Sequence, residues 1–519
     1  MKIYQIIFIS LLFIQSAFGQ KPVVKWGKEF ELDKDESYVK VLDNDDENTY
    51  LQTEKYKVVK FGIVNPNIPT PVTPIITKMD KNFNIVKKGE FKELAEKSEV
   101  VGMELLGDNF VLITEKKNRE KKSREFYMAL INKELEVVKP NTLLWSTQSV
   151  NKEETITFDF SPDNSVMIIN CIYKEERKDK SKNYVFKVIN KDLETVFQKE
   201  PAFSQFSGKF ILIQSVLTND GDVYLIGKNS KSKEEKENAQ EMYELSAYKC
   251  SVDGKENAIK VPMPDYYFPL GVYASSSGDN NDIYVFAQYT TAEFNGVTGY
   301  IVSKIDGQSN SVVYSQTNEF DASFIKKVND LNYDKTKSKD PGISSNFSFS
   351  YIKVNKDNSL YVVMEKTYSE SNQMQGRSYN TYYAQSLLAI NIDQNGKQKW
   401  IKIIPKSQYY NSMTTYLNFF AKANADKLYV FYNETEKNID NSLTISSQSK
   451  KFNDLKDFYQ MMVEINSTGM MKKSVFLNPE QAPYGYLVKN YISTGPNQFL
   501  LIGKGYKKDV LIFGTGTFE

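Results

Sequence analysis

One recurring pattern limits what this chain can fold into: an apolar stretch, a short polar turn and a second apolar stretch. Residues 387–404, LLAINIDQNGKQKWIKII, are the clearest copy, and the turn occupies 393–397. Because Asp, Asn and Gly favour the backbone conformations of tight turns, each copy predicts a β-hairpin. Further copies occupy 74–86, 126–138, 183–197, 247–261, 299–314 and 462–476.

A second element, a polar turn followed by an alternating apolar strand, occurs eight times. Its markers lie 56 to 77 residues apart and are Tyr50, Val111, Met167, Tyr224, Tyr284, Tyr361, Tyr429 and Leu500. A period of this length is typical of solenoids and propellers. Each unit contains four predicted antiparallel strands, and four-stranded units repeated around an axis form a β-propeller.

The two ends of the chain bear on the number of blades. After three strands of the eighth unit the chain stops, whereas residues 22–30 resemble the fourth strand of the first unit. We therefore expect the N-terminal strand to pair with 508–515 and to close the ring, which leaves few exposed strand edges. The sequence predicts an all-β, eight-bladed β-propeller of four-stranded blades as a single domain over 20–519. Seven blades is the alternative, if the terminal strands merge differently.

The first residues have the composition of a secretory signal peptide. Lys2 precedes an apolar run, and Ala17 and Gly19 supply the small residues expected before a cleavage site. We expect residues 1–19 to be removed and the protein to be exported to the periplasm, the cell surface or the medium. No later apolar run approaches the roughly 18 residues that a membrane-spanning helix needs. The abundance of Asn, Ile and Lys is typical of a bacterial source.

The balance of charges and the absence of histidine argue against nucleic-acid binding and against histidine-dependent catalysis. Without residues 1–19 the chain has 65 basic and 65 acidic residues, since only Lys2 is lost from the 66 basic residues. A balanced chain lacks the basic field that gathers phosphate backbones, which argues against nucleic acid as a partner. The chain has no histidine, which excludes Ser-His-Asp and Cys-His nucleophiles and His-ligated zinc.

Cysteine and acidic patterns do not indicate a cofactor or metal site. Cys171 and Cys250 each lie in an apolar strand pattern that suits a buried free thiol, although export permits a bridge between them. Acidic turns such as 43–47 and 219–222 lack the spacing of a calcium-binding EF-hand loop. We expect no cofactor and no metal.

The sixth unit, LLAINIDQNGKQKW, resembles the repeat of quinoprotein-type (PQQ-like) propellers. Ala389, Gly396 and Trp400 match that repeat, while Asp393 is displaced by two places and Asn395 stands where the repeat has threonine. The resemblance implies an eight-bladed propeller. Catalytic quinoproteins carry an adjacent cysteine pair and an acidic calcium site, and Cys171 and Cys250 lie 79 positions apart. No cofactor residues are therefore carried over from the family.

Extra chain is concentrated in the connections between the second and third strands of the predicted blades. The long ones are 115–124, 174–183, 231–240 and 433–457, and a connection at 319–346 carries a predicted short helix with Phe324, Val328 and Leu331 at helical spacing. Binding residues often lie on such loops over a rigid scaffold. Arginines there can clamp carboxylate or phosphate groups, although charged tips are also explained by solvation. The candidates are Arg119, Arg124, Arg177 and Arg377.

Aromatic side chains cluster in the connections between predicted blades, where they should open toward the central mouth. Tyrosine offers a flat apolar face and a hydroxyl, which suits sugars and peptide segments. Packing between blades is the simpler explanation for the same residues. The candidate binding residues are Tyr266, Tyr267, Phe268, Tyr409, Tyr410, Tyr484 and Tyr486, and Trp145 lies in a similar position.

Two functions fit these patterns. The first is a non-catalytic binding or scaffolding propeller of the bacterial cell envelope or secreted space, with a protein partner on its long-loop face. The alternative is a carbohydrate-binding protein or a carboxylate-based polysaccharide-active enzyme at the central mouth, because glycosidase chemistry needs only two suitably spaced acids. Fold alone does not decide between them, since propellers host many functions.

Overall fold

A computed structural model describes the chain from Lys21 to Phe518, with internal gaps. The predicted signal peptide therefore lies outside the described residues. The gaps are 60–67, 148–153, 175–181, 204, 207–209, 231–242, 265–266, 292–295, 332–341, 375–376, 412–415, 425, 437–438, 440–449, 452–457, 481–484 and 506–508. No described helix is long and apolar enough to cross a membrane.

The strands sort into eight sheets that are antiparallel apart from one short pairing, and within most of them strand order follows the chain. The chain is thus an all-β, eight-bladed β-propeller, as the repeat predicts, and the seven-blade alternative is wrong. The sheets fall into two compact units, which are described separately. Unit 2 comprises Asp33–Asn295 and Gly299–Glu319, and unit 1 comprises the residues up to Leu32, Gly296–Thr298 and Phe320–Glu519.

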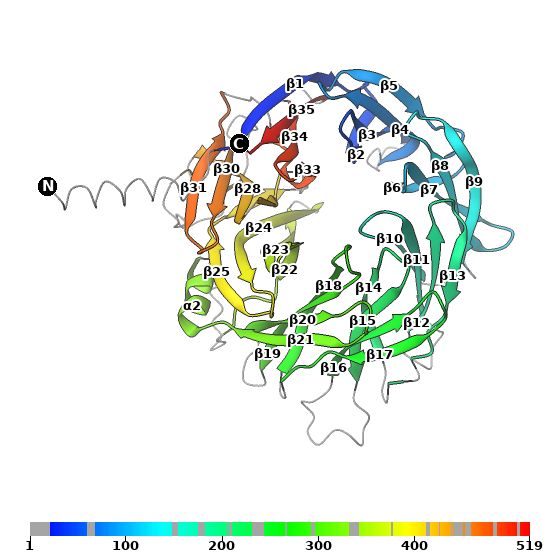
Figure 1. Cartoon of the computed structure of the whole chain (residues 1–519). Helices are drawn as coiled ribbons and strands as arrows, with labels where there is room; N and C mark the ends of the chain where they lie inside the picture. Colours follow the sequence, from blue (N-terminus) through cyan, green and yellow to red (C-terminus); the bar gives the residue numbers. More distant parts are fainter. Residues whose placement is uncertain are drawn as a thin grey trace. The chain divides into compact units, whose positions relative to one another are not determined.

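Unit 2 contains five four-stranded sheets, coloured from blue to green in Figure 1. In most neighbouring sheets of this unit the first strands contact one another, which places them at the inner edge. The strands are β2 (Glu36–Asn44), β3 (Asn48–Val59), β4 (Ile68–Asp80) and β5 (Ile85–Glu90); β6 (Glu99–Leu106), β7 (Asn109–Asn118), β8 (Ser123–Ile131) and β9 (Val137–Ser146); β10 (Glu154–Phe160), β11 (Val166–Lys174), β12 (Lys182–Asn190) and β13 (Thr195–Lys199); β14 (Phe210–Leu217), β15 (Val223–Ser230), β16 (Tyr243–Cys250) and β17 (Glu256–Lys260); β18 (Tyr267–Ser276), β19 (Ile283–Thr291), β20 (Gly299–Ile305) and β21 (Val312–Glu319).

Unit 1 contains the other three sheets and begins with the N-terminal strand. The sixth blade has two additional short strands, β26 and β29, and the first strand of the eighth blade is interrupted by the 3-10 helix η3 (Val488–Asn490). The strands are β1 (Val23–Glu31); β22 (Phe347–Val354), β23 (Leu360–Met374), β24 (Arg377–Ile392), β25 (Gln398–Ile404), β26 (Gln408–Asn411) and β29 (Lys450–Lys451); β27 (Phe419–Asn424), β28 (Lys427–Thr435), β30 (Phe458–Ile465) and β31 (Met471–Leu477); β32 (Gly485–Tyr486), β33 (Ile492–Gly495), β34 (Gln498–Lys504) and β35 (Val510–Thr517).

The N-terminal strand completes the eighth blade, as predicted. β1 pairs antiparallel with β35 from Val23, opposite Thr517, to Glu31, opposite Val510, with one irregularity between Trp26 and Glu29. The last strand of the chain therefore has a partner on both sides, β34 and β1. Pairing of both edges of β35 satisfies backbone groups that would otherwise face water as an open edge.

The cores lie between neighbouring sheets and are built from the apolar faces of the alternating strands. In unit 2, Met128 and Leu130 of one blade pack with Met167 and Ile169 of the next. In unit 1, Val430 and Val463 pack against Leu387 and Ala389. The predicted helix at 319–346 is present as α2 (Ala322–Leu331), and it buries Ile325 and Val328.

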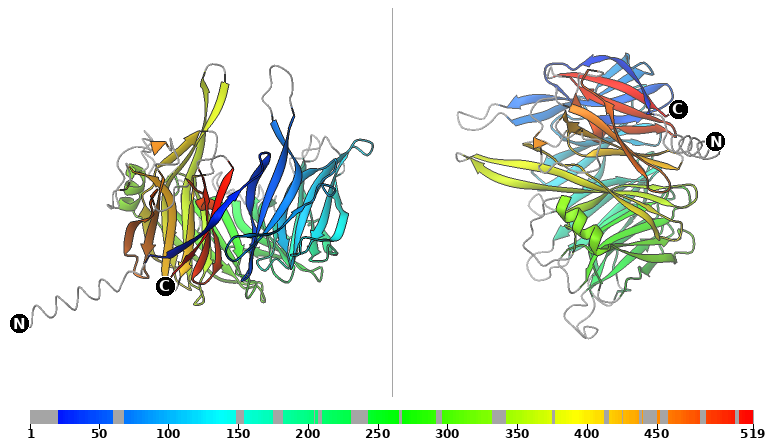
Figure 2. Two further views of the ribbon diagram at one scale, coloured as in Figure 1. Left: turned by 90° about the horizontal axis from the view of Figure 1, so that it is seen from above. Right: turned by 90° about the vertical axis from the view of Figure 1, so that its left-hand side faces the viewer.

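The two long hairpins of the described chain are not those that the sequence predicts. The connection at 115–124 is largely strand, because β7 continues to Asn118 and β8 starts at Ser123. The connections at 174–183, 231–240 and 433–457 fall mostly on residues outside the description. Instead, β23 and β24 continue far beyond their sheet (Figure 2), and β3 and β4 form a similarly extended pair in unit 2.

Candidate functional site

The extended hairpin of β23 and β24 carries a row of tyrosines. Pairing of β24 with β25 stops at Leu387, and pairing of β22 with β23 stops at Lys366, so the outer parts of β23 and β24 leave their blade. There β24 gains a different neighbour, β26, and β26 pairs in parallel with β29. Cross-strand register places Tyr368 opposite Tyr383 and Tyr383 opposite Tyr409.

Because directly opposed residues point to the same side of a sheet, these three side chains form one surface, termed here the tyrosine row (Tyr368, Tyr383 and Tyr409). The rings of Tyr368 and Tyr383 stack at 4.5 Å, and those of Tyr383 and Tyr409 at 5.8 Å. The hydroxyl of Tyr383 donates to Glu370 at 2.9 Å. Burial and this carboxylate raise the pKa of Tyr383 to about 12, so the Tyr383 hydroxyl stays protonated at neutral pH. All three tyrosines are only half-buried.

Of the aromatic residues predicted to bind, Tyr409 belongs to this row and Tyr410 lies beside it on β26. Tyr410 is opposite Tyr382 and therefore faces the other side of the same small sheet. Tyr383 and Tyr368 were not predicted as binding residues, because the stretch 369–383 is mostly polar and resembles a loop. The signal that could have found them is the pair of tyrosines at 382–383 followed by an apolar strand.

The other predicted aromatic residues have separate surroundings. Tyr267 and Phe268 lie half-buried at the start of β18 in unit 2, and the ring of Tyr267 stacks on Tyr289 at 4.3 Å. The Tyr267 hydroxyl donates to Glu319 at 2.6 Å. Tyr486 is fully buried in the core of unit 1 and does not reach the surface. Tyr266 and Tyr484 lie outside the described residues.

The predicted arginines are not gathered into a clamp in the described part of the chain. Arg124 forms a bidentate pair with Glu115, at 2.8 Å from Nε and 2.7 Å from Nη2, and its Nη1 donates to the carbonyl of Glu154. Its donors are thus used inside unit 2. Arg119 is exposed on the turn after β7. Arg377 begins β24, and its side chain, like the whole of Arg177, falls outside the description.

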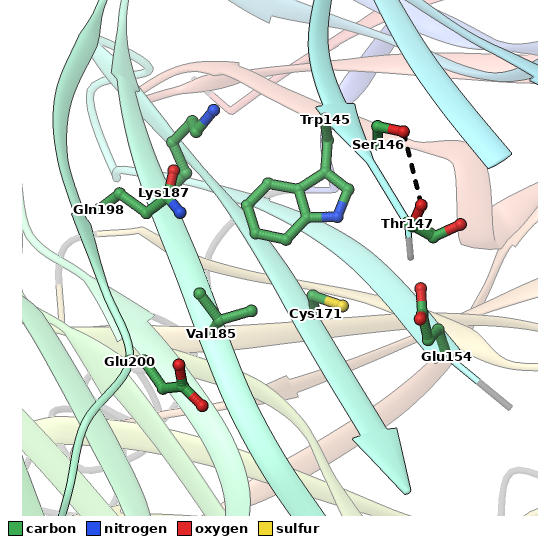
Figure 3. Close-up of a pocket in the computed structure, with 9 residues that line it drawn as sticks. All are labelled: Trp145, Ser146, Thr147, Glu154, Cys171, Val185, Lys187, Gln198 and Glu200. Atoms are coloured by element: carbon green, nitrogen blue, oxygen red, sulfur yellow. Dashed lines mark hydrogen bonds between the residues drawn. The ribbon is translucent and has the colours of Figure 1, made fainter. Parts of the chain in front are cut away.

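A second candidate lies between two blades of unit 2, at the end of β9. This cavity, termed the Trp145 pocket, has a volume of about 310 Å³. Trp145, Ser146 and Thr147 contribute from one blade, and residues of β11, β12 and β13 contribute from the next. Figure 3 shows the indole of Trp145 between Lys187 and Cys171, with its nitrogen on the Cys171 side. The remaining lining residues are Glu154, Val185, Gln198 and Glu200.

Electrostatics in the Trp145 pocket are mixed. The ammonium of Lys187 donates to the carbonyl of Leu144 at 2.8 Å and lies 5.5 Å from the centre of the Trp145 ring. Burial lowers the pKa of Lys187. Burial also raises the pKa of the Cys171 thiol to about 12, so this cysteine is not an activated nucleophile. Cys171 and Cys250 are both buried and free, so they do not form the disulfide bridge that the sequence permitted.

The described residues contain no cluster of three or more His, Cys, Asp or Glu side chains that could hold a metal ion. The two candidate surfaces offer aromatic faces, hydroxyls and amides, which suit recognition through contact and hydrogen bonding. Neither presents a thiolate or an imidazole for nucleophilic catalysis.

Comparison with known proteins adds no functional assignment. No protein-family model matches the chain, and no curated protein matches it in sequence. Similar solved structures include the polysaccharide lyase Uly1, with 8% identity, a TM-score of 0.37 and coverage of 80% of this chain and 90% of that chain. Another is the β-propeller domain of the Trilobed protease from Pyrococcus furiosus, with 11% identity, a TM-score of 0.34 and coverage of 86% of this chain and 97% of that chain. A third is an α-L-arabinanase from Penicillium chrysogenum, with 9% identity, a TM-score of 0.30 and coverage of 75% of this chain and 98% of that chain. Likenesses this distant carry no argument about activity.

Proposed function

We propose that this chain is a non-catalytic binding propeller of the bacterial cell envelope or secreted space, and that the tyrosine row docks a protein partner. The observation that supports the proposal is the row itself: three stacked tyrosines, half-buried, on strands that leave their blade. Export follows in this proposal from the signal-peptide composition of residues 1–19.

Protein recognition suits this surface for physical reasons. Tyrosine supplies large contact area with little loss of side-chain entropy, and it is enriched in the residues that dominate binding energy. Pairing with β26 and stacking hold the three rings in place before a partner arrives, which reduces the entropy cost of binding. The hydroxyls, one of which donates to Glu370, leave polar groups at the rim.

The test compares the purified protein with variants that remove single rings of the row, Tyr383→Ser and Tyr409→Ser. Tyr243→Ser is the matched control, since Tyr243 is an exposed tyrosine on β16 of unit 2 and does not belong to the row. Partners are captured from envelope extracts, identified, purified and titrated against each variant. We expect each row variant to weaken binding about 30-fold, the effect of losing a typical hot-spot residue, and Tyr243→Ser to bind like the wild type.

Two results would contradict the proposal. One is a purified partner that binds the row variants as tightly as the wild type while thermal melting shows all of them folded. The other is turnover of a polysaccharide panel, detected as release of reducing ends, which would make the protein an enzyme.

A further inference from the structure

The Trp145 pocket interrupts an otherwise apolar interface between two blades of unit 2. Toward one end, Met167 and Ile169 of β11 pack into the core with Met128 and Leu130 of the preceding blade. Toward the other end, Cys171 follows on the same face of β11, and beside it the interface opens into about 310 Å³. This volume is at the lower end of the range of small-molecule pockets, so it suits a single ring and not an extended chain.

Polar groups surround this space from several elements. Glu154 stands at the start of β10, Lys187 on β12 and Gln198 on β13, while Glu200 follows β13 and Thr147 follows β9. Together they supply carboxylate acceptors, an amide with both donor and acceptor atoms, and a hydroxyl. Such a set matches a ligand that carries several hydroxyl groups, each of which donates and accepts hydrogen bonds.

The mixed charges of the pocket favour a neutral ligand. Lys187 supplies one ammonium beside the carboxylates of Glu154 and Glu200, while the neighbouring Arg124, which donates to the Glu154 carbonyl at 3.1 Å, is already paired with Glu115. An anion such as a phosphate would face two carboxylates, and a cation would face the ammonium of Lys187. Neither arrangement resembles the one-signed sites that bind charged ligands tightly.

Trp145 packs against the core between the two blades, but its indole nitrogen differs from that of Trp400 in its hydrogen bonding. Both tryptophans lie on the outermost strand of a blade. The indole of Trp400 donates to the carbonyl of Ser467 at 3.0 Å, and Gly469 lies close against its ring. The Nε1–H of Trp145 is buried and has no hydrogen-bond partner of normal geometry among the described residues. The nearby sulfur of Cys171 is a weak acceptor.

We propose that the Trp145 pocket binds one neutral sugar ring, held against the indole of Trp145 and hydrogen-bonded by Glu154, Gln198 and Glu200. The apolar C–H face of a sugar suits an indole, and its hydroxyls suit the surrounding carboxylates and amide. This site is separate from the tyrosine row and lies in the other unit, so it adds a ligand to the proposed protein partner.

Calorimetric titration of the full protein tests this proposal with free glucose, galactose, mannose, N-acetylglucosamine, xylose and arabinose. Glycine and inorganic phosphate represent zwitterionic and anionic ligands. We expect at least one sugar to bind with a dissociation constant in the millimolar range, as befits a small ligand with one ring contact and a few hydrogen bonds, and glycine and phosphate not to bind.

Variants locate the binding. Trp145→Ala should weaken it about tenfold, which corresponds to loss of one ring contact. Glu200→Ala should have a comparable effect, and because Glu200 is exposed this change leaves the core intact. Trp26→Phe is the control, since Trp26 lines a different groove with Val24, Phe476 and Leu477. The proposal is overturned if no sugar binds, if glycine or phosphate binds instead, or if Trp145→Ala and Glu200→Ala bind the sugar as well as Trp26→Phe does.

Discussion

A buried ion pair joins Glu365 of β23 to Lys406, just before β26, in unit 1. The side chain of Lys406 is fully buried and that of Glu365 is 4% exposed. Burial raises the pKa of Glu365, and the neighbouring Lys406 lowers it in part. Lys406 also donates to Gln408 at 3.2 Å. The pair lies at the base of the extended hairpin, so it links the tyrosine row to the rigid blade.

The first prediction concerns this pair. Lys406→Met leaves the Glu365 carboxylate buried without its cation, so the free energy of unfolding should fall by about 3–5 kcal/mol. The double variant Glu365→Met/Lys406→Met replaces the pair by apolar groups and should unfold within about 1 kcal/mol of the wild type. Urea denaturation measures both. Equal destabilisation by the single and double variants would show that the charges are not what the site depends on.

The second prediction concerns Lys422 of β27, whose ammonium donates at 2.6 Å to Ser493 Oγ and to the carbonyl of Gly495. Burial, with a smaller effect from Lys353, lowers the pKa of Lys422 from 10.5 to about 8. The folded protein therefore binds this proton less well than the unfolded chain. The resulting penalty is absent above about pH 10.5 and reaches about 3 kcal/mol below about pH 8.

Lys422→Met removes this titrating group and also two hydrogen bonds. Loss of the hydrogen bonds changes the free energy of unfolding by an amount that varies little with pH. The difference in unfolding free energy, variant minus wild type, should therefore rise as the pH is lowered from 10.5 to 8 and then level off. Denaturant titrations at several pH values in this range measure it. A difference that does not change with pH would mean that Lys422 titrates normally in the folded state.

At the level of single elements, several of the turns between the third and fourth strands share one hydrogen-bonding scheme. In the turn after β24, Asp393 Oδ1 accepts from the backbone N–H of Asn395 and of Lys397, both at 2.9 Å, and Gly396 has a φ of 84°. Asn190 plays the same role after β12, but there the left-handed position is Leu193, whose side chain is buried. Burial of an apolar side chain compensates for the strained backbone.

The third prediction follows from this turn. Asp393→Ala removes two hydrogen bonds to the backbone at a partly exposed site and should lower the free energy of unfolding by about 1–2 kcal/mol. Asp393→Asn keeps the acceptor oxygen and should cost less than about 0.5 kcal/mol. Thermal and urea denaturation of the pair check this. If both substitutions cost the same, the carboxylate charge and not the hydrogen bonds would hold the turn.

The same turns explain which elements could be predicted from sequence. An Asx residue with Gly three positions later, as in 393–396, signals a hairpin through its own chemistry, and the hairpins were predicted correctly. The outer parts of β23 and β24 carry no such signal, because the stretch is mostly polar, with Ser369 and Glu370 exposed, and has no regular apolar alternation. Their strand structure depends on pairing with β26, which is distant in sequence. The tyrosine row was therefore predicted only at Tyr409.

At the scale of the whole molecule, repetition made the architecture predictable. Eight similar units, each with its own turn chemistry, indicated eight blades, and the missing fourth strand of the last unit indicated the N-terminal segment. The Trp145 pocket could not be predicted from the repeat, because it depends on how side chains of one blade pack against the neighbouring blade. Among its lining residues, the sequence drew attention only to Trp145, as an aromatic residue near a blade connection, and to Cys171, as a buried thiol.

The pairing of β1 with β35 is the claim on which the blade number rests, and a disulfide cross-link tests it directly. Lys25 lies opposite Thr515, and opposed positions on antiparallel strands have the Cα separation that a disulfide needs. The variant Lys25→Cys/Thr515→Cys should form the disulfide almost completely in the folded protein. The control Lys25→Cys/Lys399→Cys should not form one, because Lys399 lies on β25, which pairs with β24. The native Cys171 and Cys250 are buried and should not interfere. Equal, low cross-linking in both variants would contradict the closure of the eighth blade by the N-terminal strand.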